Sequence, residues 1–460
     1  MSREDIIKNL VRAPSTLAKN TAWTLLGRVL RVVAQAIYFF SLARSLGVAE
    51  YGAFVGAIAT VSIIAPFSSL GSGNLLIKHV SQDRSAFCRS WGEALIITVL
   101  SGVFLSLVGT IISSLFLPVT ISWKLVLLLA VADLIFARIA EVAAQAFQAI
   151  EDVRTASALM LGFGVCRMLA ALALMIILHR ASALTWALLY LLSSVVPCFG
   201  AILVVNLKIG MPSYAFSVRS GELLQGFYFA ISLSAQTIYN DVDKIMLVRM
   251  AGLRPAGIYG AAYRLVDVAC APLGALLYAA YPRFFLLGKQ GIHACLQFAR
   301  RLVARSAIWG IVASTGLFVC APLLLPILGR QYADSVAALR WLAPIVLLRC
   351  VHYLAADTLT GCGYQGLRSS IQVLVAIVNV SLNMVILPRY SWRGAAWTSL
   401  ISDGILLLAL WSSVLILARI SKGGESTIRP GSQPSVLSLQ TTFPDEAKLS
   451  SPQLECNNAD

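Results

Sequence analysis

Charge is scarce in this chain: Asp, Glu, Lys and Arg make up 12% of its 460 residues, against about one-quarter in average soluble proteins. Hydrophobic residues make up 58% of the chain, and the mean hydropathy is +0.80. This composition excludes an ordinary soluble domain, because too few polar residues remain to cover the surface of one. It predicts an integral membrane protein.

Motifs of catalysis and metal binding are also missing from the sequence. There is no phosphate-binding G-x-x-x-x-G-K-[ST], no H-E-x-x-H and no G-x-S-x-G, so neither ATP use nor hydrolysis is indicated. The nine cysteines are scattered without a C-x-x-C pair, which argues against a zinc site or a disulfide framework. We therefore expect no cofactor, no metal and no enzymatic activity.

Long apolar runs dominate the sequence instead. A bilayer crossing needs about 20 mostly apolar helical residues, and about twelve such runs can be found. They lie near 20–42, 52–71, 92–117, 123–148, 155–178, 183–207, 223–250, 256–281, 303–328, 336–358, 369–388 and 394–418. Because the runs are continuous rather than alternating, they predict an all-α bundle of transmembrane helices.

The spacing of these runs divides the chain into segments. We expect a cytoplasmic segment over 1–19, an N-lobe of six helices over 20–208, a cytoplasmic linker over 209–222 and a C-lobe of six helices over 223–420. Residues 421–460 are rich in Gly, Ser, Pro, Gln and Asn without periodicity, which predicts a disordered cytoplasmic tail.

Positive charge is distributed unevenly among the connections. Lys and Arg are more frequent in the segments that share a side with the N-terminus, which predicts that both termini are cytoplasmic. The net charge of +15 is spread over the ends of the runs rather than gathered on one face. It indicates contact with anionic membrane lipids and not with nucleic acid.

Two turns echo each other at the start of the two halves. Each has an arginine, a glycine three residues later and a Tyr-Gly pair that opens the next run. The matching residues are Arg44, Gly47, Tyr51 and Gly52 in the first turn, and Arg249, Gly252, Tyr259 and Gly260 in the second. The echo predicts a duplication of six helices plus six, with parallel repeats about an axis along the membrane normal and a site at their interface.

The same turns carry a family resemblance. The stretches "ARSLGVAEYG" (43–52), "NDVDKIMLVRMAG" (240–252) and "GIYGAAYRL" (257–265) resemble polysaccharide flippases of the Wzx type, in the multidrug/oligosaccharidyl-lipid/polysaccharide exporter superfamily. The resemblance implies two pseudo-symmetric lobes around a central cavity that opens alternately to each side of the bacterial cytoplasmic membrane. It implies a polyprenyl-pyrophosphate-linked oligosaccharide as cargo, for surface or exopolysaccharide assembly, with other assembly proteins as partners. The two extra C-terminal spans of the related lipid II flippases are lacking here.

Charged residues within the runs are candidates for the site, because charge in a bilayer is costly and usually faces a polar pathway. Residues three apart share a helix face, so local ion pairs are predicted between Arg138 and Glu141, Asp241 and Lys244, and Arg264 and Asp267. Arg28 and Arg31 have no acid within one turn, Arg167 stands alone in its run, and Arg349 has His352 one turn away.

Arginine matches phosphate oxygens with a fixed fork of donors, so surplus cations fit an anionic cargo. The predicted substrate-binding residues are Arg28, Arg31, Lys244, Arg264, Arg167 and Arg349. Carboxylates near the membrane midplane can load and release a proton or sodium as a cavity reorients. The predicted ion-coupling residues are Asp133, Asp241, Asp267 and Asp403, for which structural salt bridges are the alternative.

Two other functions compete with the flippase. A multidrug or organic-cation antiporter of the same superfamily would need an acidic or aromatic cavity rather than a basic one. A membrane polysaccharide polymerase would need catalytic groups on a sizeable external loop, and the expected external connections are short.

Overall fold

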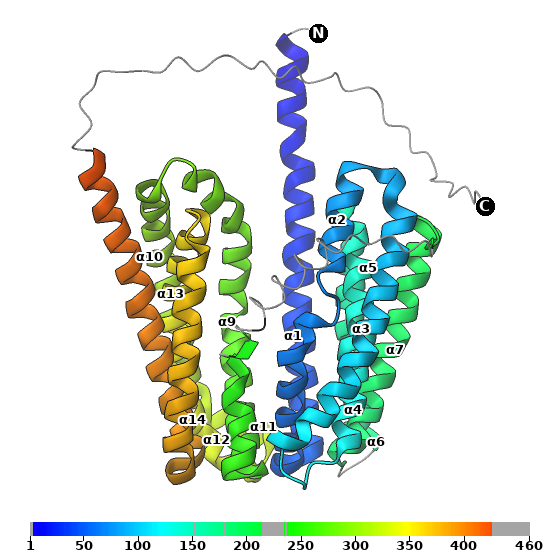
Figure 1. Cartoon of the computed structure of the whole chain (residues 1–460), viewed down its shortest axis with the longest axis vertical. Helices are drawn as coiled ribbons and strands as arrows, with labels where there is room; N and C mark the ends of the chain where they lie inside the picture. The colour runs from blue at the N-terminus through cyan, green and yellow to red at the C-terminus, as the bar shows by residue number, and fades with distance from the viewer. Residues whose placement is uncertain are drawn as a thin grey trace.

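The computed structural model describes the backbone of residues 3–150, 152–177, 181–213, 234, 237, 238 and 240–425. Within these ranges, side chains are described from residue 30 onward, except for residues 31, 78, 81, 82, 153, 278, 279, 282 and 422–425. All regular structure in the described chain is helical, and the helices form two bundles side by side (Figure 1). The predicted all-α membrane fold is confirmed.

The N-lobe contains the first half of the chain. Its long helix α1 (Arg3–Ile64) is two helices joined at Gly47, where the φ of 73° requires a glycine. The other N-lobe elements are η1 (Ala65–Phe67), α2 (Ser72–Gln82), η2 (Arg84–Ala86), α3 (Phe87–Phe116), α4 (Trp123–Ala130), the π-helix η3 (Val131–Ala137), α5 (Arg138–Ala149), α6 (Val153–Ile177) and α7 (Ala183–Lys208).

The C-lobe repeats this plan. A helix over 240–251 leads to Gly252, whose φ of 96° again requires a glycine. The remaining elements are α9 (Leu253–Gly288), α10 (Ile292–Cys320), η4 (Ala321–Leu323), α11 (Leu324–Leu328), η5 (Arg330–Tyr332), α12 (Ala333–Leu342), α13 (Pro344–Gly361) and α14 (Gln365–Glu425). Helix α14 is also two helices, which meet at Ser391 with a φ of 53°.

These helices account for the expected spans. Eight helical segments of the described chain are long and apolar enough to cross a membrane, and the first and last of them contain Gly47 and Ser391, so each holds two crossings. The fourth expected span is divided by η3 into α4 and α5. The seventh span and the expected linker over 209–222 lie partly outside the described residues. Residues 421–425, expected to begin the disordered tail, are instead the last residues of α14, and the tail from residue 426 onward lies outside the described residues.

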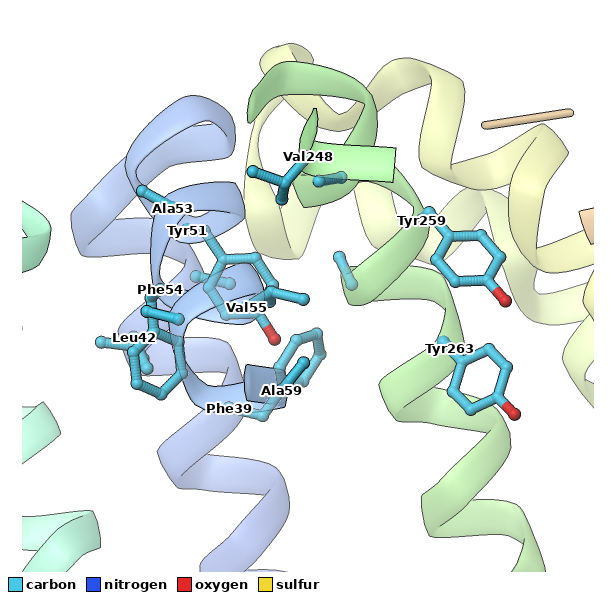
Figure 2. Close-up of a cluster of buried hydrophobic side chains, with 14 of the residues drawn as sticks. Phe39, Leu42, Tyr51, Ala53, Phe54, Val55, Ala59, Val248, Tyr259 and Tyr263 are labelled. Atoms are coloured by element: carbon cyan, nitrogen blue, oxygen red, sulfur yellow. The ribbon is translucent and has the colours of Figure 1, made fainter. Parts of the chain in front are cut away.

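The buried side chains show where the two lobes meet. One hydrophobic core contains residues of α1, α4 and α7 together with residues of α9, α12 and α13, so it belongs to both lobes. Figure 2 shows part of this core, with Tyr51 and Val55 on α1 close to Val248 of the C-lobe. Two further cores lie within the C-lobe alone and another lies within the N-lobe alone. The lobes are therefore joined at the end where Gly47 lies, and their ribbons diverge toward the end where α1 begins (Figure 1).

The outer faces of both lobes are apolar. Ile111, Ile176 and Leu408 are each about 70% exposed, at 71%, 72% and 69%, although water would penalise such exposure. Bilayer lipid removes this penalty, because the side chains then pass into hydrocarbon. The chain is a multi-pass membrane protein.

Candidate functional site: a cavity between the lobes

A cavity of about 560 Å³ lies between the two lobes. Its size falls within the range of about 300–1,000 Å³ that is usual for ligand sites. The N-lobe contributes aromatic and small or aliphatic residues of α1, together with Arg167 of α6 and Tyr190 of α7. The C-lobe contributes most of the charge, from residues of the helix over 240–251, of α9 and of α13. The charged and amide residues that line the cavity are Arg167, Asn240, Asp241, Lys244, Arg264, Asp267 and Arg349.

Arg167 is held firmly in the N-lobe wall. Its Nη2 lies 2.5 Å from Oδ1 of Asp133 and 3.3 Å from Oγ of Ser194. The guanidinium also stacks on Tyr190, 4.0 Å from the ring centroid, and the hydroxyl of Tyr190 donates to both carboxylate oxygens of Asp133 at 3.0 and 3.1 Å. Asp133 lies in the π-helix η3, a feature that is frequent at functional sites. Arg167 stands alone in its apolar run, as the sequence indicates, and its partner Asp133 comes from another helix.

Lys244 forms the local pair that its spacing predicted. Its Nζ lies 2.6 Å from Oδ1 of Asp241 and donates to the carbonyl oxygen of Asn240 at 2.7 Å. The same ammonium lies 4.2 Å from the ring centroid of Tyr263, close enough for a cation–π interaction. Two neighbours thus fix the charge of Lys244 at the cavity wall while Asp241 neutralises it.

Arg349 is the centre of a buried network in the C-lobe. It lies 3.4 Å from Oδ1 of Asp267 and 3.8 Å from Oδ1 of Asp403, and it also donates to the hydroxyl of Tyr263. Asp403 lies 2.9 Å from Nε2 of His352. Arg349 is only 4% exposed, and two carboxylates offset the cost of burying its charge.

Arg264 differs from the other cations of the cavity. It lines the cavity and is half-buried, yet it makes no hydrogen bond or ion pair with any residue that the structure describes. The predicted pair between Arg264 and Asp267 was wrong, because Asp267 turns to Arg349 on α13 instead. The predicted pair between Arg138 and Glu141 is present at 2.6 Å, away from the cavity.

The predicted site residues therefore gather in one place as far as they are described. Of the predicted substrate-binding residues, Lys244, Arg264, Arg167 and Arg349 line the cavity, whereas the side chains of Arg28 and Arg31 lie outside the described residues. Of the predicted ion-coupling residues, Asp241 and Asp267 line the cavity, and Asp133 and Asp403 lie behind the arginines that they contact. Of these four cavity-lining cations, Arg167, Lys244 and Arg349 are paired with carboxylates, and Arg264 has no ion-pair partner among the described residues.

Tyrosines are the site residues that the sequence did not reveal. The cavity is lined by Tyr38, Tyr51, Tyr190, Tyr263 and Tyr353, and by Phe39 and Phe54. Tyr51 belongs to one of the echoed Tyr-Gly pairs, so that pair was a usable signal for a wall residue. For the others, no local pattern separates a cavity-lining tyrosine from one at the membrane interface.

Comparison with solved structures shows which class of protein has this fold. An inward-facing multidrug resistance MATE family transporter of the MOP superfamily matches with a TM-score of 0.70 and 14% identity, covering 87% of this chain and 100% of that one. An outward-facing MATE transporter matches with a TM-score of 0.61 and 14% identity, covering 86% and 95%. A MOP superfamily transporter from Pyrococcus furiosus, described as having a binding pocket of reverse polarity, matches with a TM-score of 0.56 and 14% identity, covering 85% and 95%. The chain therefore has the fold of these MOP superfamily transporters, which has twelve transmembrane helices.

The family follows from the sequence. The model of the family described as "Polysaccharide biosynthesis protein" matches residues 17–287, which is more than half of the chain. The protein belongs to this family. No curated protein sequence matches the chain.

Proposed function

We propose that this protein is a flippase that moves a polyprenyl-pyrophosphate-linked oligosaccharide across the bacterial cytoplasmic membrane for surface or exopolysaccharide assembly. The family and the transporter fold support transport of a polysaccharide precursor. The proposal places both termini in the cytoplasm and the polyprenyl tail in the lipid beside the lobes. Other assembly proteins would receive the cargo on the far side.

The observation that carries the proposal is the position of Arg264 in the cavity wall. No described carboxylate neutralises this guanidinium, so a phosphate oxygen of the cargo can accept its hydrogen bonds without displacing another partner. Lys244 lies on the same wall and also lines the cavity. Arg28 and Arg31 remain proposed contributors, because both belong to helix α1, whose residues from Tyr38 onward form part of the cavity wall.

The aromatic N-lobe wall suits the other part of the cargo. Tyr38, Tyr51 and Phe54 line the cavity opposite the charged C-lobe residues. A sugar ring has an apolar face that packs on an aromatic ring and hydroxyls that bond to tyrosine and asparagine side chains. In this proposal the sugars of the cargo contact the aromatic N-lobe wall, and its diphosphate contacts the cationic C-lobe wall.

The coupling ion forms a second part of the proposal. Asp133 and Asp403 each contact an arginine that lines the cavity, at 2.5 and 3.8 Å. A cargo phosphate that draws Arg167 or Arg349 toward the cavity would leave Asp133 or Asp403 without that guanidinium, although Asp133 keeps its contact with Tyr190 and Asp403 its contact with His352. A proton or a sodium ion could then neutralise the carboxylate, which would link ion binding to cargo binding. Asp241 and Asp267 are the corresponding proposed ligands at the cavity surface.

Deletion of the gene in its natural host tests the cargo. We expect lipid-linked repeat units to accumulate on the cytoplasmic side of the membrane, and the wild-type gene should reverse the accumulation. A deletion strain with normal surface polysaccharide and no trapped lipid-linked units would contradict the proposal.

A drug or organic-cation antiporter is the second candidate. The aromatic lining of the cavity and the carboxylates Asp241 and Asp267 favour it, and the similar structures include multidrug transporters. The same deletion separates the two functions. An antiporter predicts greater sensitivity to cationic dyes with unchanged polysaccharide, and the flippase predicts the reverse.

A further inference from the structure

The two echoed turns pack directly against each other where the lobes meet. A Cβ atom added to Gly52 on α1 would lie 1.9 Å from the carbonyl oxygen of Leu253, at the start of α9. A Cβ atom added to Gly257 on α9 would lie 1.9 Å from the carbonyl oxygen of Val48 on α1. The two contacts are equivalent when the repeats are aligned on Gly47 and Gly252, because Gly52 and Gly257 each lie five residues after those glycines. Only glycine allows the two backbones to approach this closely.

A second pair of contacts lies one turn further along each helix. A Cβ on Gly56 would lie 2.6 Å from a methyl group of Val248, and a Cβ on Gly260 would lie 2.9 Å from both methyl groups of Val55. Val55 and Gly260 also line the cavity. This layer therefore forms the end wall of the cavity, and the Gly52 and Gly257 layer lies behind it.

Two hydrogen bonds also join the two lobes at this end of the cavity. Nη1 of Arg44 donates to the carbonyl oxygen of Ile327 at 3.1 Å, and the buried hydroxyl of Tyr332 donates to the carbonyl oxygen of Ala43 at 2.8 Å. Both bonds join α1 of the N-lobe to the α11–η5 region of the C-lobe. Arg249, which matches Arg44 in the sequence echo, is exposed and has no partner among the described residues. The hydrogen bond of Arg44 to the other lobe therefore has no counterpart at Arg249 among the described residues.

We propose that Gly52, Gly56, Gly257 and Gly260 form a glycine seal, latched by Arg44 and Tyr332, that must part for cargo to leave the cavity at this end. At Gly52 and Gly257 the two backbones meet without a side chain between them, and at Gly56 and Gly260 the glycine faces only a valine side chain, so these surfaces can separate and close again without moving large side chains. The latch contributes hydrogen bonds that water can replace once the lobes move apart. This inference rests on the proposed function only in requiring that a cargo passes between the lobes.

Cysteine cross-linking tests whether the seal must open. The ideal Cβ of residue 260 lies 3.4 Å from Cβ of Val55, close to the separation of about 3.5–4.5 Å found in disulfides. In the double variant Val55→Cys/Gly260→Cys we expect a disulfide that stops export and a reductant that restores it. The single variants Val55→Cys and Gly260→Cys are the controls, because native cysteines are present in all three proteins. Full export by the cross-linked protein would overturn the proposal.

Opening can also be measured without any cargo. Ser62 lines the cavity together with the free cysteine Cys270, so Ser62→Cys combined with Cys270→Ser reports access of a membrane-impermeant thiol reagent added on the side of the membrane where Gly47 lies. Adding Gly52→Ala or Gly257→Ala should raise the labelling rate at least about fivefold, because the new methyl group forces the backbones apart. Gly274→Ala is the matched control on α9, where an added Cβ meets nothing within 4 Å.

The latch is tested in the same assay. Arg44→Gln should raise labelling because it removes the hydrogen bond to Ile327, whereas Arg249→Gln should leave labelling unchanged because Arg249, which is also exposed, makes no hydrogen bond with a described residue. Unchanged labelling in both alanine variants, with normal folding of each, would overturn the seal. Because labelling needs no cargo, a failed flippase test with the expected labelling would reject the cargo and keep the seal.

Discussion

Replacing Arg264 with glutamine separates cargo binding from folding more cleanly than any other change at the site. Arg264 lines the cavity and pairs with no described carboxylate. Its removal therefore leaves no described charge without a partner, and the melting temperature should stay unchanged. A hydrogen bond to a charged group contributes about 1.5–3 kcal/mol. Losing one such bond to the cargo phosphate should weaken binding by about 10- to 150-fold.

The assay is export of surface polysaccharide in a deletion strain that carries Arg264→Gln, with the protein level measured in the membrane. Arg138→Gln is the matched control, since Arg138 also lies in a helix but pairs with Glu141 and does not line the cavity. We expect Arg264→Lys to recover part of the activity through its charge alone. Export at the wild-type rate by Arg264→Gln at normal protein level would refute the assigned role.

Three further changes probe the rest of the structure. Arg349→Gln should destabilise the protein by about 3–5 kcal/mol, because it removes the guanidinium from beside the buried carboxylate of Asp403 and leaves that carboxylate with the neighbouring His352; thermal unfolding in detergent checks this, and an unchanged melting temperature would contradict the network. Arg167→Lys should retain the charge beside Asp133 but lose the stacked guanidinium, so transport should fall while folding persists; equal transport would show that the stacking is dispensable. Asp152→Asn should cost about 0.3–1 kcal/mol at neutral pH, because asparagine can still cap the helix and only the charge is lost. Burial raises the pKa of Asp152, but hydrogen bonds from Thr155 outweigh this and lower it below 3.8, so its stabilisation is present above the unfolded pKa and is lost as the pH falls through the folded one. The difference between Asp152→Asn and wild type should disappear in unfolding measurements at low pH, and a difference that persists would contradict this sign.

Local patterns predicted the helices well because each crossing is specified by its own composition. Gly47 and Gly252 were visible as echoed residues, and their positive φ angles of 73° and 96° explain why glycine recurs there. Ser391 was not foreseen, although it breaks α14 with a φ of 53°. A serine in that conformation has no sequence signature comparable to a glycine.

Pairing within the site could be predicted only over short distances. Lys244 and Asp241 lie one helical turn apart, so their contact follows from helix geometry. Arg264 and Asp267 have the same spacing, but Asp267 contacts Arg349, which lies 82 residues further along the chain. Nothing in the local sequence specifies such a contact, because it depends on how α9 and α13 pack.

Translocation in reconstituted vesicles tests the central claim most directly, namely that a cationic wall between the lobes receives the anionic headgroup of a lipid-linked cargo. The purified protein would be placed in liposomes that contain a fluorescent polyprenyl-pyrophosphate-linked sugar, and the fraction accessible to an external enzyme would be followed over time. The account predicts protein-dependent translocation that is at least about tenfold slower with Arg264→Gln. Translocation absent from the wild-type protein, or equally fast in the variant, would contradict it.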